Sequence, residues 1–123
     1  MTTATFERDT DEFIIDTPSA LATKWWPGDM GTIANYAMVF AKLKLPDEAG
    51  EKYYDYGVAP FIVQIRDLDT HKHIPGVESG DMGPKLGMNS KDNGWLILHG
   101  LRVPRKNMLS RYKKVYRDGT VSV

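Results

Sequence analysis

The sequence has 123 residues, 41% hydrophobic and 26% charged, which is the composition of an ordinary globular domain. Its 16 Lys and Arg residues balance 16 Asp and Glu residues, so no net positive field attracts nucleic acid or an anionic membrane. Cys is absent, which excludes disulfides, thiolate metal sites and a cysteine nucleophile. No apolar run approaches the roughly 18 residues that span a bilayer. We expect one domain over residues 1–123, with neither nucleic acid nor a membrane as partner.

Extended runs recur along the chain, and Gly, Pro, Asn or Asp marks almost every boundary between them, which is typical of an all-β domain. The expected strands cover residues 2–8, 12–16, 21–26, 33–45, 57–66, 95–99 and 101–103, followed by a terminal hairpin over 112–123 about Asp118-Gly119. Residues 46–55 are expected to form a surface loop. Residues 67–85 contain too many Gly and Pro residues for any long element.

The run over 33–45 could also be helical by periodicity, since Ala, Met, Leu and Lys are good helix formers. We favour a strand, because its neighbours are strands and its side chains divide into two alternating faces. One face carries Tyr36, Met38, Phe40 and Lys42, and the other carries Ala37, Val39, Ala41 and Leu43. The predicted fold is therefore a small antiparallel β-barrel or β-sandwich of seven or eight strands.

Motifs for independent catalysis are weak. His71 and His73 share one face of an extended segment but lack a third ligand for a metal. No nucleophile elbow or phosphate-binding loop is present, and the paired carboxylates lie in predicted turns. The C-terminal third is basic and could contact either ligand phosphates or a partner domain. Its cations are Arg102, Arg105, Lys106, Arg111, Lys113, Lys114 and Arg117.

The most informative stretch is residues 23–31, which contain two adjacent Trp residues followed by Pro27 and Gly28. Adjacent strand residues face opposite sides, so one Trp is expected in the core and the other at the surface. An exposed ring beside the backbone N–H of a Gly suits a flat heteroaromatic ligand. The alternative is that the Trp pair is divided between the core and a subunit interface.

Lys24-Trp-Trp-Pro-Gly28 resembles the hallmark of the acyl-CoA oxidases, flavoenzymes of peroxisomal fatty-acid β-oxidation. Further segments resemble the middle domain of that family in the same order. They are Asn35-Tyr-Ala, Pro60-Phe-Ile-Val-Gln-Ile-Arg66, Thr70-His-Lys, Pro75-Gly-Val, Gly80-Asp-Met-Gly-Pro-Lys-Leu-Gly87, Asp92-Asn-Gly-Trp-Leu and Val103-Pro-Arg-Lys-Asn-Met-Leu109. The resemblance covers essentially the whole sequence.

The resemblance implies a β-barrel middle domain that covers FAD between two helical domains. Trp26 would then lie beside the isoalloxazine ring, Gly28 would present its backbone near flavin N5, and Trp25 would serve packing. It also implies fatty acyl-CoA and O₂ as substrates, a homodimer and a peroxisomal parent protein, although this sequence shows no targeting signal. The catalytic Glu and the helical domains would lie outside residues 1–123, so the isolated chain is expected to be inactive.

The sequence departs from the family pattern where such oxidases usually continue with Gly-Gly and Gly-Lys-Thr. Here Gly28 is followed by Asp29, and Gly31 by Thr-Ile. A carboxylate facing the reduced flavin would oppose its anionic form, whereas a solvent-facing Asp29 would have little effect. The loop between Leu45 and Gly57 also looks longer than usual. The alternatives are a non-catalytic binding or assembly module that uses the basic C-terminal third, and an acyl-CoA dehydrogenase middle domain.

Overall fold

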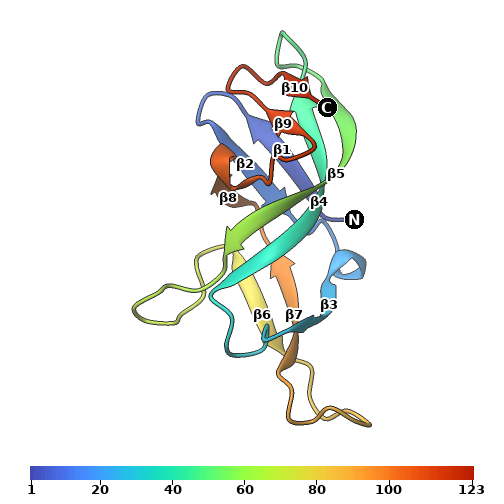
Figure 1. Cartoon of the computed structure of the whole chain (residues 1–123), viewed down its shortest axis with the longest axis vertical. Coiled ribbons are helices and arrows are strands. Elements are labelled where there is room, and N and C mark those ends of the chain that lie inside the picture. The colour runs from blue at the N-terminus through green and yellow to red at the C-terminus, as the bar shows by residue number, and fades with distance from the viewer.

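Ten β-strands and two short 3-10 helices make up the chain in a computed structural model, which describes residues 1–123 (Figure 1). Strand accounts for 49% of the residues and helix for 5%, which confirms the all-β prediction. The elements are β1 (Thr3–Glu7), β2 (Glu12–Asp16), η1 (Ala20–Ala22), β3 (Lys24–Gly28), β4 (Tyr36–Pro46), β5 (Tyr53–Gln64), β6 (Val77–Asp81), β7 (Asn93–Leu98), β8 (Leu101–Pro104), η2 (Arg105–Asn107), β9 (Lys114–Val115) and β10 (Val121–Ser122). No helix has the length and hydrophobicity needed to cross a membrane.

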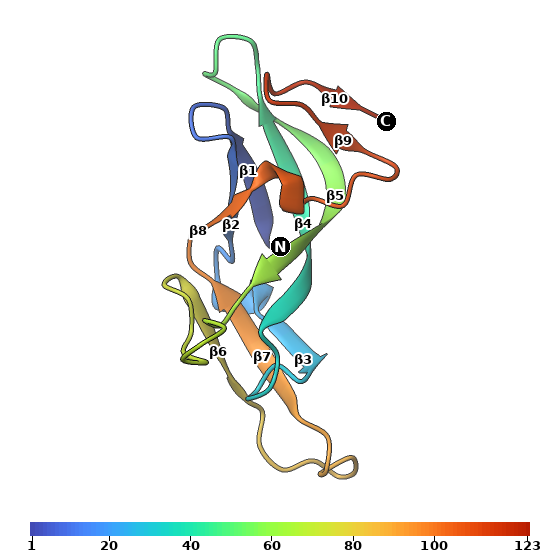
Figure 2. The ribbon, with the colours of Figure 1, turned by 60° about the vertical axis from the view of Figure 1, so that its left-hand side comes forward.

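The strands form three sheets along an elongated molecule (Figures 1 and 2). The largest has the order β5-β4-β1-β2-β8, the second has the order β3-β7-β6, and β9 pairs with β10 in the terminal hairpin. The long strands β4 and β5 run from the first sheet toward the second, and the segment between β6 and β7 extends beyond the second sheet (Figure 2). All pairs are antiparallel, as expected, except β1 with β4, which is parallel.

The core follows the alternation of the strands. In β4 the expected face of Ala37, Val39, Ala41 and Leu43 is buried, while Tyr36, Met38 and Phe40 of the other face are exposed. Three Phe rings cluster at the centre of the large sheet: Phe13 lies 5.1 Å from Phe6 and 4.9 Å from Phe61 between ring centroids. Burial of these apolar side chains is the main force that holds the sheets together.

Several predicted boundaries are wrong. Residues 20–22 form the 3-10 helix η1, with Leu21 fully exposed, so the third strand begins at Lys24 and not at Leu21. The predicted loop over 46–55 shortens to 47–52, because Pro46 still pairs with Tyr53 and Lys44 pairs with Asp55. The register shifts between Lys42 and Lys44, where β5 carries one extra residue and Gly57 adopts a φ of 79°.

The second half of the chain also differs in detail. A short strand, β6, occupies residues 77–81 within the segment expected to be broken. The strands predicted over 95–99 and 101–103 are both present, but they belong to different sheets. β7 lies between β3 and β6 in the smaller sheet, while β8 pairs with β2 in the larger one. The terminal hairpin about Asp118-Gly119 is confirmed.

Candidate functional site

A groove of about 530 Å³ lies between β3 and β4, bordered by the exposed face of β4. Eight of its eleven lining residues are hydrophobic: the lining is Thr23, Lys24, Trp25, Trp26, Pro27, Met30, Ala37, Met38, Val39, Phe40 and Leu96. The ammonium of Lys24 donates a hydrogen bond to the carbonyl oxygen of Phe40 at 2.9 Å, which ties β3 to β4. Partial burial lowers the pKa of Lys24. The groove thus offers a mostly apolar surface with a single cation.

A β-bulge in β3 shapes one end of this groove. Trp25 pairs with Trp95 and Gly28 pairs with Asn93, so β3 carries one more residue than β7 over this stretch. Trp26 lies within the bulge and has a φ of 79°, a left-handed conformation that is rare for a bulky residue. Such backbone outliers concentrate at functional sites.

The bulge overturns the prediction that one Trp is buried. Trp25 is 56% exposed and Trp26 is 51% exposed, because the left-handed residue interrupts the simple alternation of faces. Trp25 therefore lies at the surface and is not a core residue. Both indoles line the groove, and two adjacent exposed indoles are an unusual feature for a stable surface.

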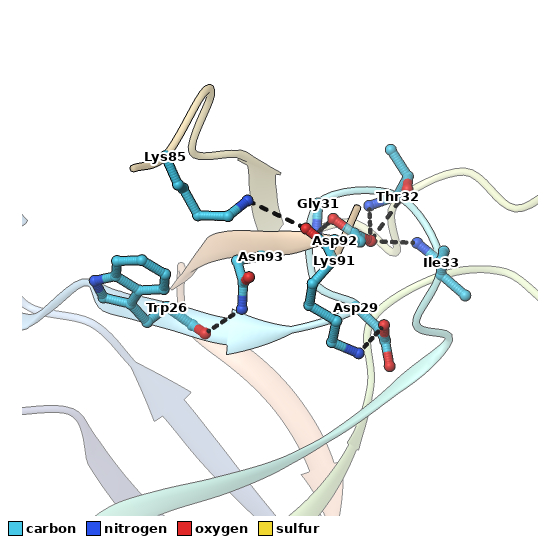
Figure 3. A network of polar contacts seen from close by, with 9 residues as sticks. All are labelled: Trp26, Asp29, Gly31, Thr32, Ile33, Lys85, Lys91, Asp92 and Asn93. Atoms are coloured by element: carbon cyan, nitrogen blue, oxygen red, sulfur yellow. Dashed lines mark hydrogen bonds and ion pairs between the residues drawn. The ribbon is translucent and has the colours of Figure 1, made fainter. Parts of the chain in front are cut away.

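Trp26 also borders a second, smaller hollow of about 360 Å³ on the side of the β6–β7 segment. Its other lining residues are Met82, Pro84, Lys85, Leu86, Gly87 and Met88. The indole of Trp26 points away from the polar groups around Asp92 (Figure 3). Trp26 therefore borders both hollows.

Gly28 is exposed at the end of β3, two residues after Trp26. A Cβ at this position would approach the side chain of Lys91 to 3.3 Å and would meet no backbone atom within 4 Å. The next residue, Asp29, forms an ion pair with Lys91 at 2.6 Å, and both side chains are about half exposed (Figure 3). The charge of Asp29 is thus balanced locally by a cation.

Asp92 caps the turn that joins β3 to β4. Its carboxylate accepts hydrogen bonds from the backbone N–H groups of Gly31 at 3.1 Å, Thr32 at 2.9 Å and Ile33 at 3.2 Å (Figure 3). It also accepts one from the Thr32 hydroxyl at 3.1 Å. Desolvation works to raise the pKa of Asp92, but the hydrogen bonds from these groups outweigh it and hold the pKa below 3.8.

Arg66 contacts the same turn from its carbonyl side. Arg66 is only 3% exposed, and its guanidinium donates hydrogen bonds to the carbonyl oxygens of Met30 at 3.0 Å, Gly31 at 3.1 Å and Ala34. Sequence reasoning missed Asp92 and Arg66 as supporting residues. Both lie in segments that carry the family resemblance, but their partners are more than 30 residues away in the chain.

The two His residues considered as metal ligands contact other groups. His71 contacts the amide oxygen of Asn35 at 2.9 Å and the carbonyl of Thr32, whereas Nε2 of His73 lies 2.9 Å from the hydroxyl of Ser79. The structure places no three His, Cys, Asp or Glu side chains where they would hold a metal.

Two cations of the basic C-terminal third form ion pairs within the domain. Arg102 pairs with Glu7 at 2.5 Å, and Arg105 pairs with Asp11 at 2.6 Å. Hydrogen bonds to these arginines are the largest cause of the lowered pKa of both Glu7 and Asp11. These internal ion pairs reduce the positive charge that is free to contact a partner.

The fold and the site define a mostly-β domain with an exposed Trp pair at an apolar groove. Comparison with known proteins shows which proteins this domain is similar to. No family model matches the chain. Peroxisomal acyl-coenzyme A oxidase 1 of Dictyostelium discoideum is 48% identical over 118 residues, which are 96% of this chain and 17% of that protein. The peroxisomal acyl-coenzyme A oxidase 2 of Arabidopsis thaliana is 50% identical over 119 residues, again 17% of its length.

Comparison with solved structures finds a similar segment in another acyl-CoA oxidase. Acyl-CoA oxidase-2 of Caenorhabditis elegans, bound with FAD, ascaroside-CoA and ATP, superposes with a TM-score of 0.91 at 46% identity, covering 98% of this chain and 17% of that one. Over almost its whole length, the chain is similar to one segment of the acyl-CoA oxidases. It spans about a sixth of the length of these proteins.

Proposed function

We propose that this chain is the middle β-domain of an FAD-dependent acyl-CoA oxidase, and that it covers one face of the flavin. FAD, when bound, accepts a hydride from the fatty acyl-CoA and passes two electrons to O₂, so the products are trans-2-enoyl-CoA and H₂O₂. The base that removes the α-proton of the substrate lies outside residues 1–123. The isolated chain is therefore inactive, and its contribution is the geometry and electrostatics of the flavin site.

The groove between β3 and β4 fits a flat aromatic ring with one polar edge. Its lining is mainly apolar, it exposes two indoles, and Lys24 supplies one cation. Aromatic rings pack face to face with an offset or edge to face, and each such contact contributes about 1 kcal/mol. The single observation that carries the proposal is the left-handed Trp26 in the bulge, which exposes its indole two residues before the exposed Gly28.

Each residue then has a distinct role. Trp26 packs against the isoalloxazine, while Gly28, which lacks a Cβ, lets the backbone approach the N5 edge closely. Asp29 adds little negative potential at that edge, because Lys91 neutralises it at 2.6 Å. The charge that Asp29 adds, where the sequence departs from the usual family pattern, is thereby balanced by Lys91 from the segment between β6 and β7.

The proposal extends to the setting of the parent protein. Relatives from three organisms are named peroxisomal acyl-coenzyme A oxidases, and we place the parent of this chain in peroxisomes on that basis. Fatty acyl-CoA and O₂ are its proposed substrates. A homodimer is its proposed assembly.

A chimera tests the function. Residues 1–123 replace the matching segment of the Arabidopsis oxidase, which is 50% identical to this chain. We expect the purified chimera to retain FAD and to release H₂O₂ when palmitoyl-CoA is added, whereas the 123-residue chain with added FAD releases none above a protein-free control. A folded chimera without bound FAD would contradict the proposal, and so would peroxide release by the isolated chain.

A further inference from the structure

The turn between β3 and β4 is held by two opposite charges that act on opposite sides of its backbone. The carboxylate of Asp92 accepts hydrogen bonds from three consecutive N–H groups, and the guanidinium of Arg66 donates to three carbonyl oxygens. Gly31 takes part in both sets: its N–H donates to Asp92 and its carbonyl accepts from Arg66. A turn fixed from both sides has little freedom to change conformation.

Arg66 makes this arrangement costly to disturb. Its buried guanidinium has no carboxylate partner, and its remaining hydrogen bond goes to the hydroxyl of Ser79 at 3.2 Å. A buried charge is stable only when hydrogen bonds satisfy its donors, so the carbonyl groups of the turn must stay in place. Movement of the turn would leave the cation unsatisfied.

Close packing of glycines restricts the turn further. A Cβ on Gly94 would lie 2.5 Å from the nitrogen of Gly31 and 2.4 Å from the carbonyl oxygen of Gly80. A Cβ on Gly31 would lie 2.4 Å from Oδ1 of Asp92. The turn therefore rests directly on the backbone of β7, at a separation that only glycine permits.

Asp92 and Asn93, where β7 begins, also hold the residues proposed to face the flavin. The backbone carbonyl of Asp92 accepts a hydrogen bond from the N–H of Asp29 at 2.6 Å. The side-chain amide of Asn93 donates to the carbonyl of Trp26 at 3.2 Å, and Asn93 pairs with Gly28 across the strands (Figure 3). Thus one short segment fixes the backbone on both sides of Gly28.

We propose that Asp92 and Arg66 are positioning residues that hold the turn after β3 in one conformation and thereby fix the indole of Trp26 and the backbone of Gly28 against the flavin. This inference rests on the function proposed above. It assigns no direct flavin contact to either residue. Its consequence is that a change at Asp92 alters the flavin environment through the turn.

The test uses the chimera with bound FAD. Asp92→Asn removes the charge that the three N–H groups share, and Arg66→Lys keeps the charge of Arg66 but loses its planar set of donors. Asp118→Asn is the matched control, because Asp118 accepts hydrogen bonds from the N–H and hydroxyl of Thr120 in the terminal hairpin. The readouts are the FAD dissociation constant, the flavin reduction potential and the visible flavin spectrum.

We expect Asp92→Asn and Arg66→Lys each to weaken FAD binding at least fivefold and to shift the flavin spectrum and potential, while Asp118→Asn changes none of them. In the 123-residue chain, we expect Asp92→Asn to speed amide hydrogen exchange at Gly31, Thr32 and Ile33 at least tenfold. If Asp92→Asn does not fold, Thr32→Val carries the test, because it removes only the hydroxyl that donates to Asp92.

The outcomes separate the inference from the function on which it rests. If Trp26→Ala weakens FAD binding but folded Asp92→Asn and Arg66→Lys leave affinity, spectrum and potential unchanged, the positioning role is wrong and the proposed function stands. If Trp26→Ala also leaves FAD binding unchanged, both are wrong. Equal loss of stability in the Asp92 and Asp118 variants, without a flavin-specific change, would likewise assign Asp92 a purely structural role.

Discussion

The side-chain amide of Asn93 donates a hydrogen bond to the backbone carbonyl of Trp26, 3.2 Å away, across the register shift between β3 and β7. This contact satisfies the carbonyl of a residue whose φ of 79° takes it out of regular strand geometry. The two residues are 67 positions apart in the chain. The exposed indole of Trp26 is therefore supported by the neighbouring strand and not by local sequence alone.

Replacing the two Trp residues one at a time distinguishes their roles. In the chimera we expect Trp26→Ala to weaken FAD binding by about 1 kcal/mol, roughly fivefold, because it loses the contact with the flavin ring. Trp25→Ala is the comparison: its indole is similarly exposed and also lines the groove, but we assign it to packing, so we expect a smaller loss of FAD affinity. Flavin content and thermal unfolding of the purified variants provide the measurement. Equal flavin loss in both variants would contradict the distinction.

Gly31→Ala tests the close contact of the turn after β3 with Asp92 and Asp81. The added methyl group would lie 2.4 Å from Oδ1 of Asp92 and 3.1 Å from Cα of Asp81, so we expect it to lower the free energy of unfolding by about 1–3 kcal/mol. Gly87→Ala is the control, because a Cβ there has open space around it. Urea denaturation of both variants measures the difference. Equal stability of the two would show that the turn can move away from β7.

The stability of the domain is expected to fall slightly as the pH drops below 6.5. Desolvation, and then the nearby charge of Arg66, lower the pKa of His73 below 6.5, and the opposing effect of Glu78 is smaller. Above pH 6.5 the ring is neutral in both the folded and the unfolded chain. As the pH falls, the unfolded chain takes up the proton first, so the free energy of unfolding decreases until the folded pKa is passed.

Urea denaturation at pH 7.0 and pH 5.5 measures this effect. His73→Gln should reduce the difference between the two conditions. Asp67 and Asp92, whose pKa values are lowered from 3.8, lose their stabilising contribution only in more acidic solution. An unchanged difference in the His73 variant would assign the pH dependence to another group.

We expect the 123-residue chain to self-associate at micromolar concentration. Strand β1 has no free edge, because it lies between β2 and β4. The open edges are instead β5 and β8 in the large sheet and β3 and β6 in the smaller one. Sedimentation over a dilution series is the test, and a monomer at every concentration would contradict the expectation.

Local patterns in the sequence predict much of the fold. The bounds of β2 match those predicted, and the two faces of β4 are confirmed, because alternation and turn residues act over a few positions. The parallel pairing of β1 with β4 was not predicted, since it depends on contacts across some 40 residues. No local pattern indicates which strands become neighbours over that distance.

The site shows the same division. The sequence draws attention to Trp26 and Gly28, and both are exposed: Trp26 lines the groove, and Gly28 lies at the end of β3. Exposure of Trp25 was missed, because the alternation argument assumes a regular strand and the left-handed Trp26 breaks it. Arg66 was missed because it ends the apolar run predicted as a strand, where an Arg usually reaches solvent, whereas here the turn provides carbonyl groups for it.

The most direct test of the central claim is a crystal structure of the chimera with FAD, in which the distance from the backbone nitrogen of Gly28 to flavin N5 is measured. We expect this distance to be within hydrogen-bond reach, about 3 Å, with the indole of Trp26 against the isoalloxazine ring. A flavin bound elsewhere in the protein, with Trp26 and Gly28 facing solvent or another chain, would contradict the assignment of this β-domain as the flavin cover.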